Sequence, residues 1–346
     1  MESLKKTCIN GRSTAAESLP DDLENCLSRK KWGYEMRTIQ VGSRKSKLAL
    51  IQSGMVIKSL SSKSDHFSFD IKHIVTKGDR ILDVTLSKIG GKGLFVKEIE
   101  RALLDGSIDF AVHSMKDMPA ELPQDLEIAS IPKREDPHDV LIFREYKKLE
   151  ELSPGAVVGT SSLRRAAQIL NIRPDLTIRS LRGNVDSRIA RLKSGDFDAI
   201  VLAAAGMKRL GVEEKGENLP FDLMLPAVGQ GALAIECRSS DTELKALLEK
   251  INNEETAVTV RAERSFLKRL NGGCQVPIAA FCERRKDGML AMSGLVASAD
   301  GTKLLKTSRL GDQPEALGIM AAEDLLVQGA GKILSDLGTE SDPDAR

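Results

Sequence analysis

Aromatic side chains and excess charge of either sign are what this sequence has least of. Only 3% of its 346 residues are aromatic, and 51 Lys and Arg are matched by 50 Asp and Glu. The net charge of +1 gives no general attraction to nucleic acid or to an anionic membrane. Scarce aromatics also disfavour platforms for stacking single-stranded bases. No apolar run approaches the roughly 20 residues that span a bilayer. We therefore expect no nucleic-acid partner and no membrane partner.

Cysteine is also scarce and unpatterned. The five Cys are an odd number at scattered positions, unlike the framework of a disulfide-stapled secreted domain. There is no C-x-x-C, and the spacing of Cys274 and Cys282 is not that of a zinc site, so we expect no metal. These features favour a reducing, cytoplasmic compartment. The remaining composition, 41% apolar and 29% charged, is that of ordinary globular domains, and the length allows two or three of them.

The first 36 residues differ from the rest. They carry six basic and six acidic side chains and no apolar segment of the secretory type. Transit peptides are poor in acidic residues, which argues against that class as well. We expect a disordered extension over residues 1–36, with the fold beginning near Met36. Were it a targeting segment, an organellar stroma would replace the cytoplasm.

Two halves of the chain repeat one plan. Residues 41–51 and 156–167 each show the end of a β-branched run, a Gly turn, a hydroxyl cap and a helical pattern. Residues 106–112 and 195–201 each show a helix stop followed by an apolar strand. This alternation predicts two α/β domains with largely parallel sheets. In such sheets ligands bind at the carboxyl ends of the strands.

The chain changes character after Asn252-Asn253. A helical pattern starts at residue 254, and one last helix is predicted over residues 314–337. Strand-like runs lie between them, at 276–282, 289–296 and 303–308. We expect a third, smaller α+β domain.

Basic and hydroxyl side chains gather at the predicted strand ends and helix starts. Free N–H groups and the helix dipole favour an anion there, and Arg forks add bidentate carboxylate contacts. The alternative is that each cation is merely solvated. Taken together, the set indicates a ligand with several carboxylates or phosphates. Its members are Ser43, Arg44, Ser46, Thr160, Ser161, Ser162, Arg164, Arg165, Arg182, Arg188, Arg191, Lys208 and Arg209.

A second candidate is the segment 112–119, which leaves a predicted strand and turns at Pro119. Asp117 beside Lys116 at the end of a buried strand is a candidate general acid/base. The alternative is an Asp that caps its own turn. His113 alone is more typical of a hydrogen-bonded structural residue.

Two Gly-rich segments add mobile or accessible groups. Residues 88–95 carry Lys88 and Lys92 among glycines, without P-loop spacing. They are interpreted as a lid that brings cations to an anion, or as a plain surface turn. Cys274 lies in the turn 270–277, where a thiolate would be a nucleophile or an attachment point, although a structural role is the alternative.

These motifs together resemble the hydroxymethylbilane synthase (porphobilinogen deaminase) family over residues 37–340. The resemblance rests on segments in matching order. They are Arg44–Ala49, Thr76–Asp79, Gly90–Phe95, Val112–Pro119, Val158–Arg165, Arg182–Asn184, Ala227–Ala232 and Gly272–Cys274.

The resemblance implies an enzyme that joins four porphobilinogens head to tail, with loss of ammonia, and releases hydroxymethylbilane. By similarity, Cys274 would hold a dipyrromethane cofactor through a thioether, and Asp117 would be the catalytic carboxylate. Asp117 would protonate the leaving amine and stabilise the cationic intermediates. Acetate and propionate groups would be held by Ser46, Lys116, Thr160, Ser161, Arg164, Arg165, Arg182 and Arg188. Arg44, Arg209, Lys88 and Lys92 would line the substrate path.

The implied fold is α/β with three domains, two of them like type II periplasmic binding proteins and a small C-terminal α+β domain. Domain 1 would comprise 37–135 and 232–250, domain 2 136–231, and domain 3 254–340. A monomer is expected. The alternative function is a non-catalytic two-lobed binding protein for a small dicarboxylate. A nucleic-acid binder is disfavoured by the neutral charge.

Overall fold

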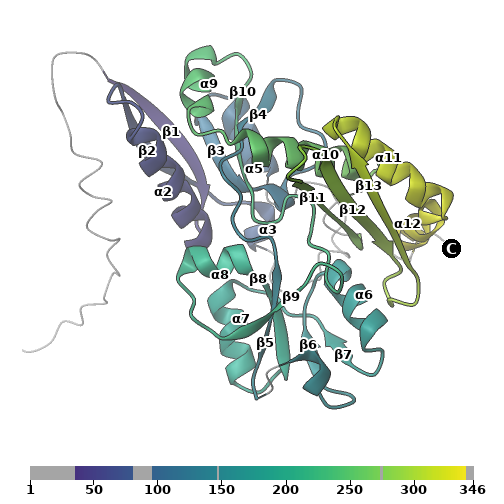
Figure 1. Ribbon diagram of the computed structural model, residues 1–346. Coiled ribbons are helices and arrows are strands. Elements are labelled where there is room, and N and C mark those ends of the chain that lie inside the picture. Colours follow the sequence, from purple (N-terminus) through teal and green to yellow (C-terminus); the bar gives the residue numbers. More distant parts are fainter. Residues whose placement is uncertain (1–35, 81–95, 146–147, 273–275, 340–346) are drawn as a thin grey trace, which may run out of the picture.

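The computed structural model describes residues 36–80, 96–145, 148–272 and 276–339 (Figure 1). The expected extension up to residue 35, the two lid lysines Lys88 and Lys92, and Cys274 lie outside the described residues. Within those ranges no helix is both long and apolar enough to cross a membrane.

The first sheet has five strands in the order β2-β1-β3-β10-β4. The strands β1, β2 and β3 are parallel, and β10 is antiparallel to both of its neighbours. One face is covered by α2 (Lys47–Ser61) and α9 (Thr242–Glu249), and the other by α5 (Lys97–Leu104). The strands are β1 (Arg37–Arg44), β2 (Phe67–Ile74), β3 (Phe110–Ser114), β4 (Leu126–Ser130) and β10 (Leu233–Arg238). The short helix α3 (Lys77–Arg80) follows β2.

The second sheet repeats this arrangement, with the order β7-β6-β8-β5-β9. Three parallel strands are again followed by an antiparallel one, here β5. Side chains from α6 (Leu163–Ile172) pack on one face, and those from α7 (Val185–Lys193) and α8 (Ala204–Leu210) pack on the other. The strands are β5 (Asp139–Phe143), β6 (Val157–Gly159), β7 (Thr177–Arg179), β8 (Ala199–Ala203) and β9 (Gly216–Leu219). The repeat predicted from the sequence is therefore present in both sheets.

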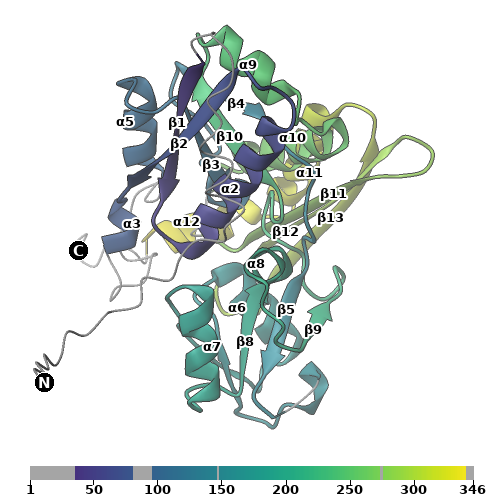
Figure 2. The same ribbon diagram turned by 90° about the vertical axis from the view of Figure 1, so that its left-hand side faces the viewer.

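The fourth strand of the first sheet, β10, comes from residues that follow the whole second lobe, whereas the second sheet is built from the consecutive strands β5 to β9. After β4 the chain crosses over residues 131–138 and enters the second sheet as β5. After β9 it crosses back over residues 220–232 and enters the first sheet as β10. The two lobes are thus joined by two adjacent crossovers, and α8 of one lobe packs against α2 of the other (Figures 1 and 2).

The third domain is an antiparallel sheet of β11 (Ile278–Arg284), β12 (Leu290–Ala297) and β13 (Leu304–Gly311). The helices α10 (Glu254–Arg269) and α11 (Pro314–Val327) cover it, and Phe266 and Leu317 are fully buried between the layers. The single helix predicted over 314–337 is wrong. Gly329 has a φ of +101°, so α11 ends there and α12 (Ala330–Thr339) begins anew.

The first strand of each repeat carries a matching glycine, Gly42 within β1 and Gly159 at the end of β6. A Cβ on Gly42 would lie 2.3 Å from Ile108 Cδ1, and one on Gly159 would lie 2.8 Å from Phe197 Cδ1. Both contacts are too short for a real side chain. Glycine at these two positions lets the backbone approach the residue that leads into the neighbouring parallel strand.

Glu263 of α10 binds both crossovers to the third domain. It is fully buried and forms a bidentate ion pair with Arg134, with distances of 2.5 and 3.2 Å. Its carboxylate also accepts hydrogen bonds from the backbone N–H groups of Gly229, at 2.6 Å, and Cys282, at 3.0 Å. A buried carboxylate is stable only with such partners. The position of the third domain is therefore fixed to the segments that join the lobes.

Candidate active site

The predicted site residues that the structure describes lie at the ends of strands of the two sheets or on the helices that follow them. Ser46 follows β1 and caps α2, its hydroxyl accepting from the N–H of Ala49 at 3.3 Å. The hydroxyl cap predicted for the helix of the second repeat is wrong, because the side chain at the cap position does not make the cap bond. Ser162 occupies the N-cap of α6 without a side-chain cap bond, and its own N–H donates to Thr160 Oγ1 at 3.2 Å.

A pocket opens beside Asp117. The one-turn 3₁₀ helix η1 (Met115–Asp117) follows β3 directly and brings the carboxylate to the end of the sheet. The pocket is also lined by Arg44 and Ser46, and by Gln52, whose Nε2 donates to Ser114 Oγ at 3.1 Å. Three of the residues predicted from the sequence therefore share one pocket. Gln52 was missed, because a glutamine within a helix carries no distinctive motif.

Asp139 organises the paired arginines of α6. Arg164 Nη1 donates to Asp139 Oδ2 at 2.7 Å, and Arg165 Nη2 donates to Asp139 Oδ1 at 2.7 Å. All three side chains are nearly or fully buried. Burial alone would raise the pKa of Asp139, but the two guanidinium groups hold it below its ordinary value. One carboxylate is thus shared by two cations, which leaves the group with net positive charge.

Other cations surround this pair. Burial, followed by the charge of Arg165, lowers the pKa of Lys116 to about 8, although Asp117 and Asp139 oppose the shift. Burial, followed by the charges of Arg165 and Arg182, lowers the pKa of Arg188 to about 10, and Asp117 opposes that shift. The structure therefore brings these predicted cations within electrostatic reach of one another and of Asp117.

The hydroxyl residues after β6 are tied to the neighbouring segment. Ser161 Oγ donates to the carbonyl of Leu181 at 2.8 Å, and the N–H of Thr160 donates to the carbonyl of Arg179 at 3.0 Å. Arg188 donates to the carbonyl of Gly183 at 2.9 Å. These bonds hold the turn that carries Arg182 against the start of α6.

Arg209 on α8 reaches the second crossover. Its Nη2 donates to the carbonyl of Gly231 at 2.7 Å, and burial lowers its pKa. Its Nε is buried and has no hydrogen-bond partner within the described ranges. An N–H in that state is suited to an anionic ligand. The neighbouring Lys208 pairs with Glu135 of the first crossover at 2.8 Å.

His113 lies on β3 and also lines the pocket beside Asp117. It is buried, and its Nε2 lies 3.0 Å from Oε2 of the fully buried Glu236. The His113 backbone belongs to β3 and pairs with Ala234 of β10. Within the described residues, neither His113 Nε2 nor the Glu236 carboxylate forms a hydrogen bond.

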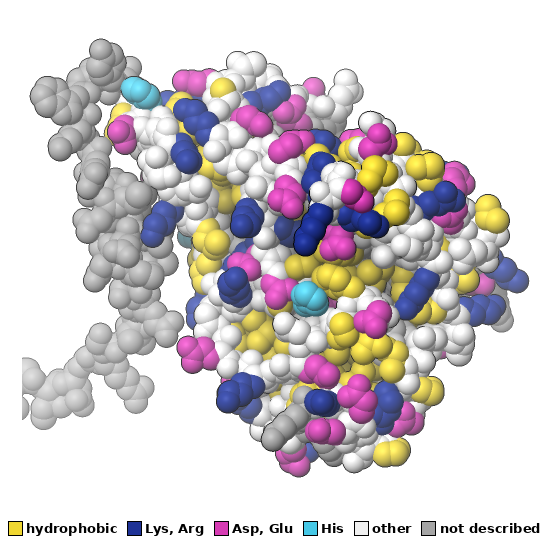
Figure 3. Space-filling model, in the orientation of Figure 1, with side chains coloured by type: hydrophobic (Ala, Val, Ile, Leu, Met, Phe, Trp, Pro, Cys, Tyr) yellow, Lys and Arg dark blue, Asp and Glu magenta, His cyan; other side chains and the backbone are white. Residues whose placement is uncertain are grey.

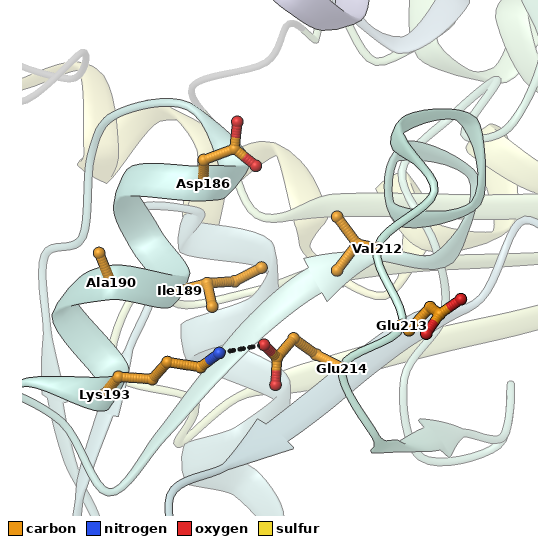
Figure 4. A pocket seen from close by; sticks show the side chains of 7 residues that line it. All are labelled: Asp186, Ile189, Ala190, Lys193, Val212, Glu213 and Glu214. Carbon is orange, nitrogen blue, oxygen red and sulfur yellow. Dashed lines mark hydrogen bonds and ion pairs between the residues drawn. The ribbon is translucent and has the colours of Figure 1, made fainter.

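A second depression lies on the second lobe, between α7 and the segment after α8 (Figure 4). Lys193 and Glu214 form an ion pair across it. None of the residues predicted for the site lines this depression. Basic and acidic side chains are interspersed over the face shown in Figure 3, in keeping with the neutral total. We therefore place the candidate active site at the pocket beside Asp117 and at the adjoining cation cluster.

Comparison with known proteins gives matches over most of the chain. The family model described as "Porphobilinogen deaminase, dipyromethane cofactor binding domain" matches residues 39–246, and that of the C-terminal domain matches residues 257–327. A porphobilinogen deaminase of Brevibacillus brevis is 55% identical over 304 residues, covering 88% of this chain and 98% of the relative. One of Bacillus subtilis is 54% identical over 313 residues, covering 90% and 100%.

Solved structures of extracellular and periplasmic binding proteins also match this chain, at low similarity. A probable amino-acid transporter binding protein of Bacillus subtilis has 13% identity and a TM-score of 0.38, covering 63% of this chain and 90% of its own. The aliphatic sulphonate binding protein of Escherichia coli has 16% identity and a TM-score of 0.38, covering 68% and 70%. On the two family matches and the full-length relatives, the chain belongs to the porphobilinogen deaminase family.

Proposed function

We propose that the protein is a transferase that condenses four porphobilinogen molecules head to tail. Each condensation releases ammonia, and hydrolysis then releases the linear tetrapyrrole hydroxymethylbilane. The observation that carries this proposal is the position of Asp117, at a pocket with Arg44 and Ser46 and within the field of Lys116 and Arg188. An acid among fixed cations suits a substrate that is anionic at its edges and becomes cationic at its reacting centre.

The cation cluster suits the carboxylates of the substrate. Each porphobilinogen carries an acetate and a propionate, so a chain of six pyrroles presents about twelve carboxylates, each able to accept charge-assisted hydrogen bonds. We assign their binding to Ser46, Lys116, Thr160, Ser161, Arg164, Arg165, Arg182 and Arg188. Arg44, Arg209, Lys88 and Lys92 are assigned to the substrate path. The protein can remain neutral overall because the cations that matter are concentrated at these strand ends.

The described residues fit a dipyrromethane cofactor. Arg164 and Arg165 share a single carboxylate, and the buried Arg209 Nε has no partner in the described part of the chain. Both features leave donor capacity for acetate and propionate groups. We assign the thioether attachment to Cys274. When bound, the cofactor supplies the pyrrole end onto which the new units are added.

Asp117 is assigned the proton transfer. Its carboxyl group would protonate the amine that leaves porphobilinogen, and the resulting carboxylate would face the positive charge left on the pyrrole. Electrostatic stabilisation of this kind is stronger where water is excluded. Arg188 and Lys116 beside it would hold the carboxylates of the same ring and so orient the ring toward Asp117.

The remaining assignments follow the family. We propose that domain 1 comprises residues 37–135 and 232–250, domain 2 residues 136–231, and domain 3 residues 254–340. The strand β10, which joins the first sheet from residues beyond the second lobe, supports this division. A cytoplasmic monomer is proposed. A binding protein for a small dicarboxylate is disfavoured, because the full-length relatives are named as deaminases.

Two measurements test the function. Purified protein incubated with porphobilinogen is expected to release ammonia and to form a linear tetrapyrrole, whereas a binding protein would bind the compound unchanged. Intact mass is expected to exceed the chain mass by two pyrrole units. A fully active protein of unmodified mass would contradict the cofactor assignment, and the same spectrum defines the N-terminus.

A further inference from the structure

Gln230 is fully buried in the second crossover, and its side chain touches both lobes. Its Nε2 donates to the carbonyl of Pro137 at 2.7 Å and to Asp139 Oδ1 at 2.9 Å. Its Oε1 lies 3.5 Å from Lys116 Nζ and 3.5 Å from Arg164 Nη2, each of which donates to it. A single amide therefore connects Lys116 of the first lobe to the carboxylate and guanidinium pair of the second.

The backbone around Gln230 fixes its position. Its carbonyl accepts from Arg134 Nε at 2.8 Å, and its N–H donates to the carbonyl of Ala227 at 2.9 Å. Gly229 and Gly231 on either side have φ values of +70° and +89°. A Cβ at either would lie 2.3 Å from an atom of Met115 or Glu135. The amide is thus held by packing on both sides before any ligand arrives.

The chemistry of an amide suits this junction. Lys and Arg side chains only donate hydrogen bonds and a carboxylate only accepts them, so Oε1 must face the cations and Nε2 must face Asp139. The group is also neutral. It orients Lys116 and Arg164 without cancelling their charge, whereas a carboxylate at this position would compete with the carboxylates of a ligand.

We propose that Gln230 is a positioning residue for the substrate carboxylates, because its amide holds the Lys116 amine and the Arg164 guanidinium in register across the two lobes. This role rests on the proposed function, in which both cations bind porphobilinogen or its products. It assigns no contact between Gln230 and the substrate.

Gln168 provides a matched control. It is a buried glutamine on α6, in the same region, but its amide bonds only to backbone groups and to Met224. Gln230→Met and Gln168→Met remove the same functional group from two buried sites. A purely structural role predicts that both variants lose melting temperature and that neither changes substrate recognition.

The test compares the two variants with wild type for cofactor mass, melting temperature, and the pH dependence of kcat and KM for porphobilinogen. Gln230→Met is expected to raise KM about tenfold or more, with kcat much less affected, since it removes bonds to charged groups. Its alkaline limb in kcat/KM is expected to move to lower pH, because the charged form of Lys116 loses an acceptor. That limb also depends on Asp117, Asp139, Arg164 and Arg165, which face Lys116 and are unchanged.

Gln168→Met is expected to keep the wild-type KM and the wild-type limb. Were Gln230→Met not to fold, Gln230→Asn, which keeps an amide but shortens its reach, is expected to show the same two changes. Equal behaviour of the position 230 and position 168 variants, with an active wild type, would overturn the positioning role alone. A wild type that consumes no porphobilinogen would instead overturn the proposed function on which it rests.

Discussion

Arg134 and Glu263 form a bidentate ion pair that joins the first crossover between the lobes to the helix α10 of the third domain. Removing one charge leaves the other buried without compensation, which costs about 3–5 kcal/mol. We expect Glu263→Gln to lower the free energy of unfolding by that amount, measured by urea denaturation. Glu323→Gln, which breaks an exposed pair with Arg269, serves as the control and is expected to cost at most about 1 kcal/mol. Equal losses of unfolding free energy in the two variants would refute the conclusion that Glu263 fixes the third domain to the crossovers.

Asp117→Asn keeps the size of the side chain but cannot transfer the same proton. We expect turnover of porphobilinogen to fall by about 10²-fold or more, with the cofactor mass retained. Asp125→Asn, at an exposed position between Pro123 and β4, is expected to keep wild-type turnover. Near-normal ammonia release from Asp117→Asn would remove Asp117 from the chemistry.

Cys274→Ala is expected to abolish the covalent adduct of two pyrrole units, as read by intact mass. Cys282→Ala is the matched control, because burial raises the pKa of the Cys282 thiol to about 12 and leaves essentially no thiolate near neutral pH. An adduct that persists in Cys274→Ala but disappears in Cys282→Ala would reverse the assignment.

The lowered pKa of Lys116 predicts a pH limit to activity. The amine is a cation below about pH 8 and loses its proton as the pH rises through that value. A carboxylate ligand is therefore bound best below this range, and kcat/KM is expected to fall above it. Lys116→Arg keeps its charge throughout and is expected to lose that alkaline limb. A limb unchanged in Lys116→Arg would show that another group titrates.

Gly159 has no room for a side chain beside Phe197. We expect Gly159→Ala to destabilise the fold by about 1–3 kcal/mol, since overpacking shifts neighbouring groups. Gly206 in α8 has only an ordinary contact at 3.9 Å, with Leu48. Gly206→Ala is therefore expected to stabilise by up to about 1 kcal/mol through helix propensity. Thermal melts of both variants test these two expectations. A Gly159→Ala variant that melted at the wild-type temperature would contradict the first.

Local patterns predicted the elements that carry the site. The repeated order of strand, glycine and helix placed Ser46, Arg164 and Arg165 around helix starts, and the structure has them at the N-cap of α2 and in the first turn of α6. Asp117 was expected after a buried strand and lies directly after β3. Such features depend on residues close together in the chain, so the sequence displays them.

Side-chain contacts between residues far apart in the sequence were not predicted. Asp139 lies 25 residues before Arg164, and Gln230 lies 114 residues after Lys116, so no spacing links them. The residue type did not identify Asp139 either, because in the sequence an aspartate at the start of a strand cannot be distinguished from an ordinary turn residue. The break at Gly329 had only a weak signal, because Gly318 and Gly331 in the same segment remain helical.

The position of β10 in the first sheet constrains the order in which the fold can form. The first sheet places β10 between β3 and β4, so β4 has no partner in that sheet until residues 233–238 exist. A ribosome must therefore synthesise the whole second lobe before the first sheet can close. Up to that point the emerging chain exposes the edges of β3 and β4, and the last third of translation completes a domain whose first strand was made near the beginning.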